Sequence, residues 1–181
     1  MHDWVALTSG EIPSPELVAA WVTLGMVPTE RIPLWAAHWL VDGYDGQAVR
    51  ALAGFSGTDP YEVHDTLPDA LADCRTPIPD SDSAAAQTAF TKLARMHADG
   101  AAGEKWIIDK VDEILARTGY ASSVISLPLG QLYGLDEEWG EGWGRTTQQL
   151  TAEVQRACAA QLAACSPAAA VLLEPDETTR P

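Results

Sequence analysis

Apolar residues recur along this chain at the three-to-four-residue spacing of amphipathic helices, and no useful stretch alternates with the period of two that strands require. Proline and glycine separate the apolar segments. The pattern predicts about seven helices, at roughly residues 14–24, 33–42, 47–55, 59–74, 83–98, 103–118 and 146–164. We therefore expect an all-α fold, a single-domain bundle of these helices.

Three of the predicted helices begin with clear capping signals. Ser14 precedes Pro15. Proline is favoured in the first turn of a helix because the N–H that it lacks would have no partner inside the helix at that position. Asp59, Pro60 and Glu62 have the order of a capping box, and residues 146–149 carry a similar signal for the last helix. These signals predict where the helices begin.

Two segments interrupt the helical pattern. The Pro-rich stretch at residues 76–79 predicts a rigid hinge between an N-terminal layer at about 14–75 and a C-terminal layer at about 81–165. Residues 119–145 are rich in glycine and tryptophan and read as irregular. We expect one helical domain over residues 1–166 and a partly disordered tail at 167–181.

Burial follows from the same pattern. The helix at 33–42 is apolar on all sides, so we expect it at the centre of the fold with His38 as a packed core residue. The helix at 103–118 reads as an ordinary surface helix, with Lys110 and Asp112 turned outward. Most of the seven Trp should be core anchors, and the three Cys should be reduced, with Cys158 and Cys165 buried.

An excess of acidic residues is the most distinctive feature of the composition. The chain has 26 Asp and Glu against 11 Lys and Arg, a formal net charge of −15 on 181 residues. Such a surface repels nucleic acid and anionic membranes and attracts basic proteins and cations. No run of residues is long and apolar enough to span a bilayer and the first residues lack the pattern of a secretory signal, so we expect a cytoplasmic protein.

The acidic excess gathers first on the helix at 59–74. At 100° per residue its carboxylates fall in one narrow stripe, away from the apolar face. The stripe is either a solvated helix face or a ridge that binds a basic partner. The second interpretation is kept because like charges at this spacing repel one another and no Lys is interleaved to offset the repulsion. The residues of the stripe are Glu62, Asp65, Asp69 and Asp73.

A second acidic cluster lies within the glycine-rich segment, and it adds two aromatic residues. Carboxylates with tryptophan on a loop suit the recognition of a basic protein, since interfaces enrich Trp at their hot spots. The alternative is that both Trp side chains pack on the core. The glycine spacing does not match a phosphate-binding loop. The residues are Asp136, Glu137, Glu138, Trp139, Glu141 and Trp143.

One enzymatic hypothesis rests on histidine. His38, the pair His64-Asp65, and Asp109 or Asp112 follow the order of ligands in HD-type metal phosphohydrolases, in which a divalent metal activates water. The His-Asp pair of those enzymes follows an apolar stretch, whereas here it follows Asp59-Pro60-Tyr61-Glu62-Val63. This pattern predicts neither a catalytic residue nor a bound metal with any specificity.

The block from Ile32 to Gly54, with its continuation through Asp59-Pro60 and Leu67-Pro68-Asp69-Ala70-Leu71, resembles small acidic all-helical proteins of high-GC actinobacteria. The resemblance spans about residues 32–71. It implies an all-α fold, a bacterial cytoplasmic setting, and a role of the immunity or regulatory type. It brings no catalytic motif and no site residues.

We therefore expect a non-catalytic protein-binding module without a cofactor. Its acidic surface would hold a basic protein, as an immunity or antitoxin-type inhibitor or a regulatory adaptor does. The alternative is the metal-dependent hydrolase that uses His38 and His64-Asp65. Nucleic acid and membrane are excluded as partners by charge, and the sequence leaves a homo-oligomer open.

Overall fold

Helices account for about two thirds of the residues that the structure describes. The computed structural model describes residues 12–141 and 143–165. No strand occurs within these residues, which confirms the predicted all-α fold. Their α-helices are α1 (Pro15–Thr23), α2 (Ile32–Val41), α3 (Gln47–Ala53), α4 (Pro60–Asp73), α5 (Asp82–Ala98), α6 (Glu104–Arg117), α7 (Ser122–Ile125) and α8 (Thr147–Ala164). Short 3-10 helices are η1 (Thr29–Arg31), η2 (Leu129–Leu132) and η3 (Leu135–Glu138).

The predicted helix starts are formed by their capping residues. The Ser14 hydroxyl accepts from the N–H of Leu17, and the Asp59 carboxylate accepts from the N–H of Tyr61 at 2.9 Å. Thr146 begins α8 with a complete capping box. These bonds satisfy N–H groups that have no partner inside the first turn.

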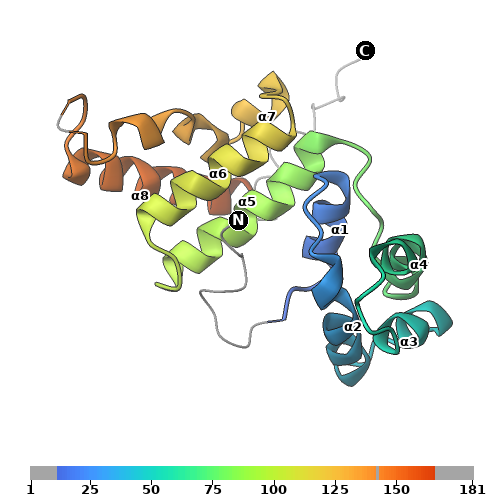
Figure 1. Cartoon of the computed structure of the whole chain (residues 1–181). Helices are drawn as coiled ribbons and strands as arrows, with labels where there is room; N and C mark the ends of the chain where they lie inside the picture. The colour runs from blue at the N-terminus through green and yellow to red at the C-terminus, as the bar shows by residue number, and fades with distance from the viewer. Residues whose placement is uncertain (1–11, 142, 166–181) are drawn as a thin grey trace, which may run out of the picture.

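The helices form two groups joined through α1 (Figure 1). Helices α2, α3 and α4 pack on one another at one end of the molecule, and α5 packs with α6, α7 and α8 at the other. Helix α1 lies against α5. The buried apolar residues of both groups belong to one continuous core, so the chain is a single domain as predicted.

The Pro-rich segment connects α4 to α5. Thr76 is buried, and the Thr23 hydroxyl of α1 donates to the carbonyl of Pro79 at 2.8 Å. The segment is therefore held against α1, and its role as a hinge stays a prediction.

Tryptophan anchors the junction between the two groups of helices. The rings of Trp21 and Trp35 lie 5.8 Å apart, and the Trp39 indole N–H donates to the carbonyl of Pro13 at 2.9 Å. All three side chains are buried. Trp143, in contrast, is 57% exposed.

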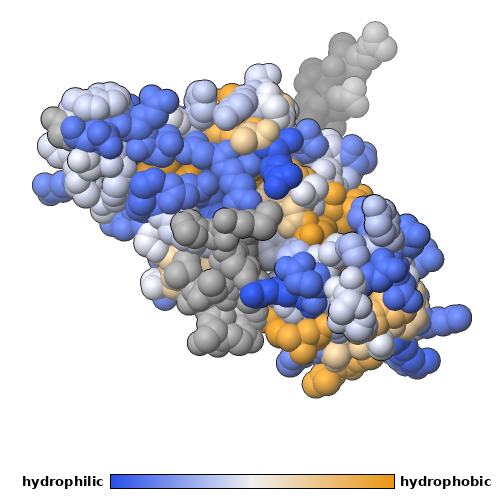
Figure 2. All heavy atoms as spheres, in the orientation of Figure 1, coloured by the Kyte–Doolittle hydropathy of each residue, from blue (hydrophilic) through white to orange (hydrophobic). Residues whose placement is uncertain are grey.

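The prediction that α2 lies at the centre of the fold is wrong. Its face with Trp35 and Trp39 is buried, whereas Leu34 is 60% exposed, Val41 is 84% exposed, and His38 lies on the same exposed side. The cause is that α2 packs on α3 and η1 and nothing described covers its other face. Figure 2 shows apolar surface at this end of the molecule.

Two further burial predictions are corrected. Cys165 is exposed at the end of α8, whereas Cys158 is buried as expected. Lys110 is buried rather than outward, because its stem packs in the core while its Nζ atom reaches Glu113 at 2.6 Å and lies 5.8 Å from the Trp106 ring centroid. The tail predicted at 167–181 lies outside the described residues.

Candidate functional site

The acidic face of α4 is the first of the two predicted binding features. The apolar face of this helix is buried through Val63, Leu67, Ala70 and Leu71. The opposite face therefore projects into solvent, and Glu62, Asp65 and Asp69 are exposed on it. None of these three carboxylates forms an ion pair with a residue that the structure describes. We call these three residues the acidic ridge.

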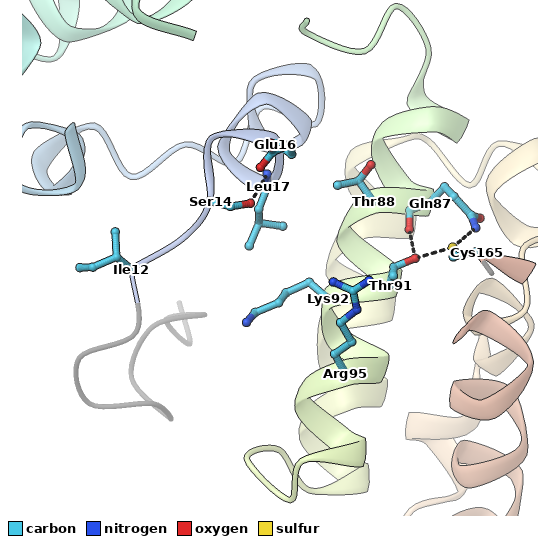
Figure 3. Close-up of a pocket in the computed structure, with 10 residues that line it drawn as sticks. All are labelled: Ile12, Ser14, Glu16, Leu17, Gln87, Thr88, Thr91, Lys92, Arg95 and Cys165. Atoms are coloured by element: carbon cyan, nitrogen blue, oxygen red, sulfur yellow. Dashed lines mark hydrogen bonds between the residues drawn. The ribbon is translucent and has the colours of Figure 1, made fainter. Parts of the chain in front are cut away.

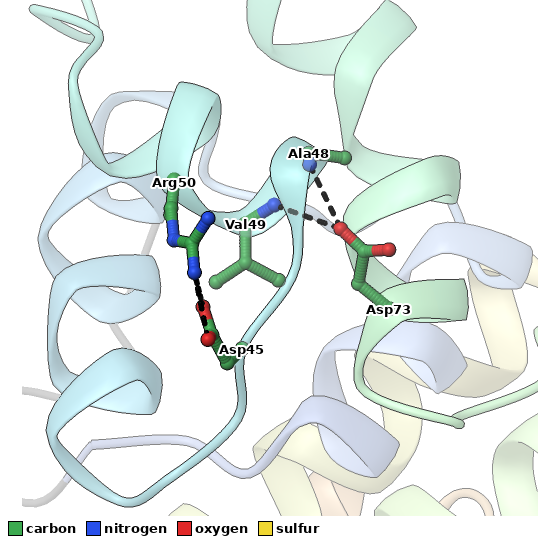
Figure 4. Close-up of polar contacts among 5 residues, drawn as sticks. All are labelled: Asp45, Ala48, Val49, Arg50 and Asp73. Carbon is green, nitrogen blue, oxygen red and sulfur yellow. Dashed lines mark hydrogen bonds and ion pairs between the residues drawn. The ribbon is translucent and has the colours of Figure 1, made fainter.

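Asp73, the fourth residue of the predicted stripe, performs a structural task (Figure 4). Its carboxylate accepts from the backbone N–H of Ala48 at 2.8 Å and of Val49 at 3.3 Å, so it caps the first turn of α3. Gly46 lies so close that an added Cβ would fall 2.1 Å from the Asp73 Cγ atom. This contact fixes α3 to α4, and a role of Asp73 in partner binding stays a prediction.

An aromatic side chain lies beside the acidic ridge. Tyr61 is 81% exposed in the first turn of α4, and His64 and Pro68 are exposed between the ridge residues. Tyr is enriched among residues that dominate binding energy at protein interfaces. The exposed face of α4 thus combines negative charge with an aromatic contact surface.

The second predicted cluster divides between η3 and the turn that follows. Leu135 is buried and fixes η3 to the core, while Trp139 packs against the core with partial exposure. Glu138 accepts from the Arg145 N–H at 2.8 Å and so closes the turn. Asp136, Glu137, Glu141 and Trp143 are exposed. The two tryptophans therefore differ: Trp139 packs against the core, whereas Trp143 lies on the surface.

The structure does not bring the two acidic clusters together. Figure 1 places α4 at one end of the molecule and the orange segment that precedes α8, which contains η3, at the other. A small partner segment that covers the acidic ridge therefore cannot also reach η3. The two clusters are separate candidate surfaces.

Sequence reasoning missed a carboxyl in α6. Asp112 was expected to face outward, but both of its carboxylate oxygens are buried and accept no hydrogen bond of good geometry. Burial raises the pKa of Asp112 to about 7, the Asp136 carboxyl and Asp109 add to the rise, and the backbone N–H of Gly134 opposes it. The side chain lies where α6 meets η3.

A signal for this burial was present in the sequence. Asp112 follows Ile108 by four residues and precedes Leu115 by three, and residues at these spacings share a helix face. Both neighbours are fully buried. The apolar spacing alone could therefore have placed Asp112 at the margin of the core, although it could not have identified the carboxyl that faces it.

The residues of the metal hypothesis lie on three helices. His38 is exposed on α2, the pair His64-Asp65 is exposed on α4, and Asp109 and Asp112 belong to α6 in the other group of helices. Over residues 12–141 and 143–165 no group of three or more His, Cys, Asp or Glu is placed to hold a metal ion. The hydrolase hypothesis stays a prediction from the sequence.

A cavity of about 500 Å³ lies between α1 and α5. Thr88 of α5 points toward α1 and Lys92 extends in the direction of Ile12, while Gln87 and Thr91 turn to the Cys165 sulfur at the end of α8 (Figure 3). Glu16 on the α1 side brings negative charge to the same space. The lining is mixed in charge and selects no ligand class.

Comparisons with protein-family models, curated proteins and solved structures found no match to this chain. Among the described helices, none is both long and apolar enough to cross a membrane.

Proposed function

We propose that this protein is a non-catalytic binding module that holds a basic protein partner on the acidic ridge of α4. The observation that carries the proposal is the alignment of three exposed carboxylates, Glu62, Asp65 and Asp69, that no described cation neutralises. A partner with Lys or Arg at matching positions supplies the missing counter-charges.

The acidic ridge does not stabilise the fold, so partner recognition is the role that its energetics favour. Like charges three and four residues apart on a helix cost a few tenths of a kcal/mol per pair. A surface ion pair formed with a partner is itself worth only about 0–1 kcal/mol. The ridge therefore acts mainly through the rate of association, which complementary charge raises by about 10- to 1,000-fold at low ionic strength.

Tyr61 provides the contact that charge alone lacks. Its ring is 81% exposed beside Glu62, although burial of an aromatic ring is favourable. A partner that covers Tyr61 while pairing with the ridge gains apolar contact and charge complementarity together. The class of partner that fits is a basic protein segment with an apolar residue among its Lys and Arg. An immunity-type or a regulatory role both agree with such a partner.

The test compares two variants of equal charge change. In the ridge variant, Glu62, Asp65 and Asp69 become Lys. In the control, three exposed residues away from α4 become Lys: Asp99 at the end of α5, Glu137 of η3, and Glu141 in the turn after η3. Each tagged protein is expressed in its native cell and isolated at low salt, and bound proteins are identified and quantified by mass spectrometry. Far-UV circular dichroism verifies that both variants stay helical.

A stoichiometric basic protein that is recovered with the wild type and the control but lost from the ridge variant supports the proposal. Equal loss from both variants would mean that net charge alone attracts the partner, and the ridge would have no special role. Loss from the control alone would move the binding surface to the η3 end. Recovery of no stoichiometric partner with the wild type would refute the binding-module function.

A further inference from the structure

Two carboxyl groups meet where α6 contacts η3. Asp112 projects from α6 with both oxygens buried and without a hydrogen bond of good geometry. The backbone N–H of Gly134 lies close enough to favour its charged form, and Asp136 of η3 lies next to it and disfavours that form. Ionised carboxylates only accept hydrogen bonds, so neither group can satisfy the other while both are charged. A charged group buried in this way is destabilising unless it is paired or protonated.

The charged groups around this pair do not neutralise it. Asp109 of α6 lies on the same side and adds negative charge. Elements η2 and α7 contain no titratable residue, and η3 adds only the acidic Glu137 and Glu138. Most basic side chains of the surrounding elements lie at other carboxylates: Lys105 binds Asp109, Lys110 binds Glu113, Arg145 lies near Glu138, Arg156 binds Glu153, and His97 lies near Glu104. Arg117 is exposed in the last turn of α6. On α5, Lys92 and Arg95 line the cavity that faces α1.

We propose that Asp112 and Asp136 share one proton, that the resulting O–H···O bond holds the η3 loop (residues 134–141) on α6, and that loss of this proton as the pH rises releases the loop. In the protonated state the Asp112 hydroxyl donates to an Asp136 oxygen. After deprotonation, two carboxylates face each other with no hydrogen between them, and their repulsion favours separation.

The backbone of the loop permits such a movement. Gly134 and Gly140 have φ values of +77° and +84°, and glycine adopts this region without a steric penalty. Leu135 remains in the core, and the Glu138 carboxylate lies at the start of the turn to Arg145. The movement is therefore confined to the exposed side of the loop, between two glycine positions.

Asp112 titrates near neutral pH, so the proposed release of the η3 loop takes place in that range. Burial, with Asp136 as the second cause, raises the pKa of Asp112 to about 7, so a change of one pH unit on either side alters the ratio of the two states about tenfold. Loss of the proton breaks the bond between Asp136 and Asp112 and leaves the Asp136 carboxylate near Glu137 and Glu141. This inference concerns the opposite end of the molecule from the acidic ridge and goes beyond the proposed function.

Nuclear magnetic resonance of the full chain without a partner tests the inference. The carboxyl ¹³C shift of Asp112 reports its protonation, and the backbone ¹⁵N heteronuclear NOE of residues 134–141 reports the order of the loop, both between pH 5 and pH 9. In the wild type we expect the loop to lose order with the same midpoint as the carboxyl titration. Glu137→Gln, which removes an exposed charge from η3, should keep that midpoint.

Two substitutions separate the carboxyl pair from a general effect of pH. Asp112→Asn keeps a donor toward Asp136 and cannot ionise, so the loop should stay ordered across the range. Asp136→Asn removes the repelling charge, so the Asp112 titration should move to lower pH. A loop whose order does not change with pH, or a midpoint that persists in Asp112→Asn, would overturn the inference. Should one variant fail to fold, the other still decides between these outcomes.

Discussion

Replacement of Asp112 by asparagine measures the energetic cost of its buried carboxyl. Burial, followed by the Asp136 carboxyl, raises the pKa of Asp112 from 3.8 to about 7 in the folded chain. Over this range the folded protein retains a proton that the unfolded chain has released. The free energy of unfolding therefore falls as the pH rises from about 4, and it levels off above about pH 8.

The size of the effect follows from the two pKa values. For one group that titrates at 3.8 unfolded and at about 7 folded, linkage gives a loss of about 3 kcal/mol between pH 5 and pH 8. Because Asp112 as a whole is only partly buried and Asp136 is exposed, solvent screening reduces this loss, and we expect about 1–2 kcal/mol. Asp112→Asn removes the loss because asparagine does not titrate.

Urea unfolding followed by far-UV circular dichroism at pH 5, 6, 7 and 8 provides the measurement. The free energy of unfolding of Asp112→Asn, taken relative to that of the wild type, should rise by about 1–2 kcal/mol from pH 5 to pH 8. Asp65→Asn, at an exposed carboxylate on α4, should follow the wild-type profile. Parallel stability profiles for the wild type and Asp112→Asn would refute the reasoning.

Two further predictions concern α3 and the thiols. Asp73→Ala removes the cap of α3 and should lower the free energy of unfolding by about 1 kcal/mol, whereas Asp69→Ala, at an exposed ridge position, should change it by less than about 0.5 kcal/mol; equal effects in urea unfolding would contradict the capping role. Cys165 is exposed, while burial raises the pKa of Cys74 and of Cys158 to about 11. A thiol reagent at neutral pH should therefore label Cys165 first, and equal labelling rates by mass spectrometry would contradict this.

The helices could be predicted because their signals are local. Asp59 and Pro60 fix the start of α4, and the spacing of Val63, Leu67 and Leu71 determines which side is buried. The exposure of the acidic ridge then follows from geometry, since Glu62, Asp65 and Asp69 lie away from that side. For this surface, the sequence pattern was sufficient.

The remaining features depend on contacts between distant segments. Helix α2 is apolar on all sides, and its sequence cannot tell that only the face with Trp35 and Trp39 meets other helices. The cap that Asp73 provides for α3 requires the two helices to be placed first. Likewise, the position of Asp112 beside Asp136 results from the packing of η3 on α6, which no local pattern encodes.

The dependence of association rate on salt tests the central claim most directly. Stopped-flow measurements with the isolated partner would give the association rate constant of the wild type, the ridge variant and the charge-matched control at several ionic strengths. We expect the association rate constant of the wild type and of the control to fall steeply as salt is added. For the ridge variant we expect a rate constant at least tenfold lower at low salt, with only a shallow dependence on salt. Identical rates and salt dependence in the wild type and the ridge variant would contradict the assignment of the acidic ridge as the binding surface.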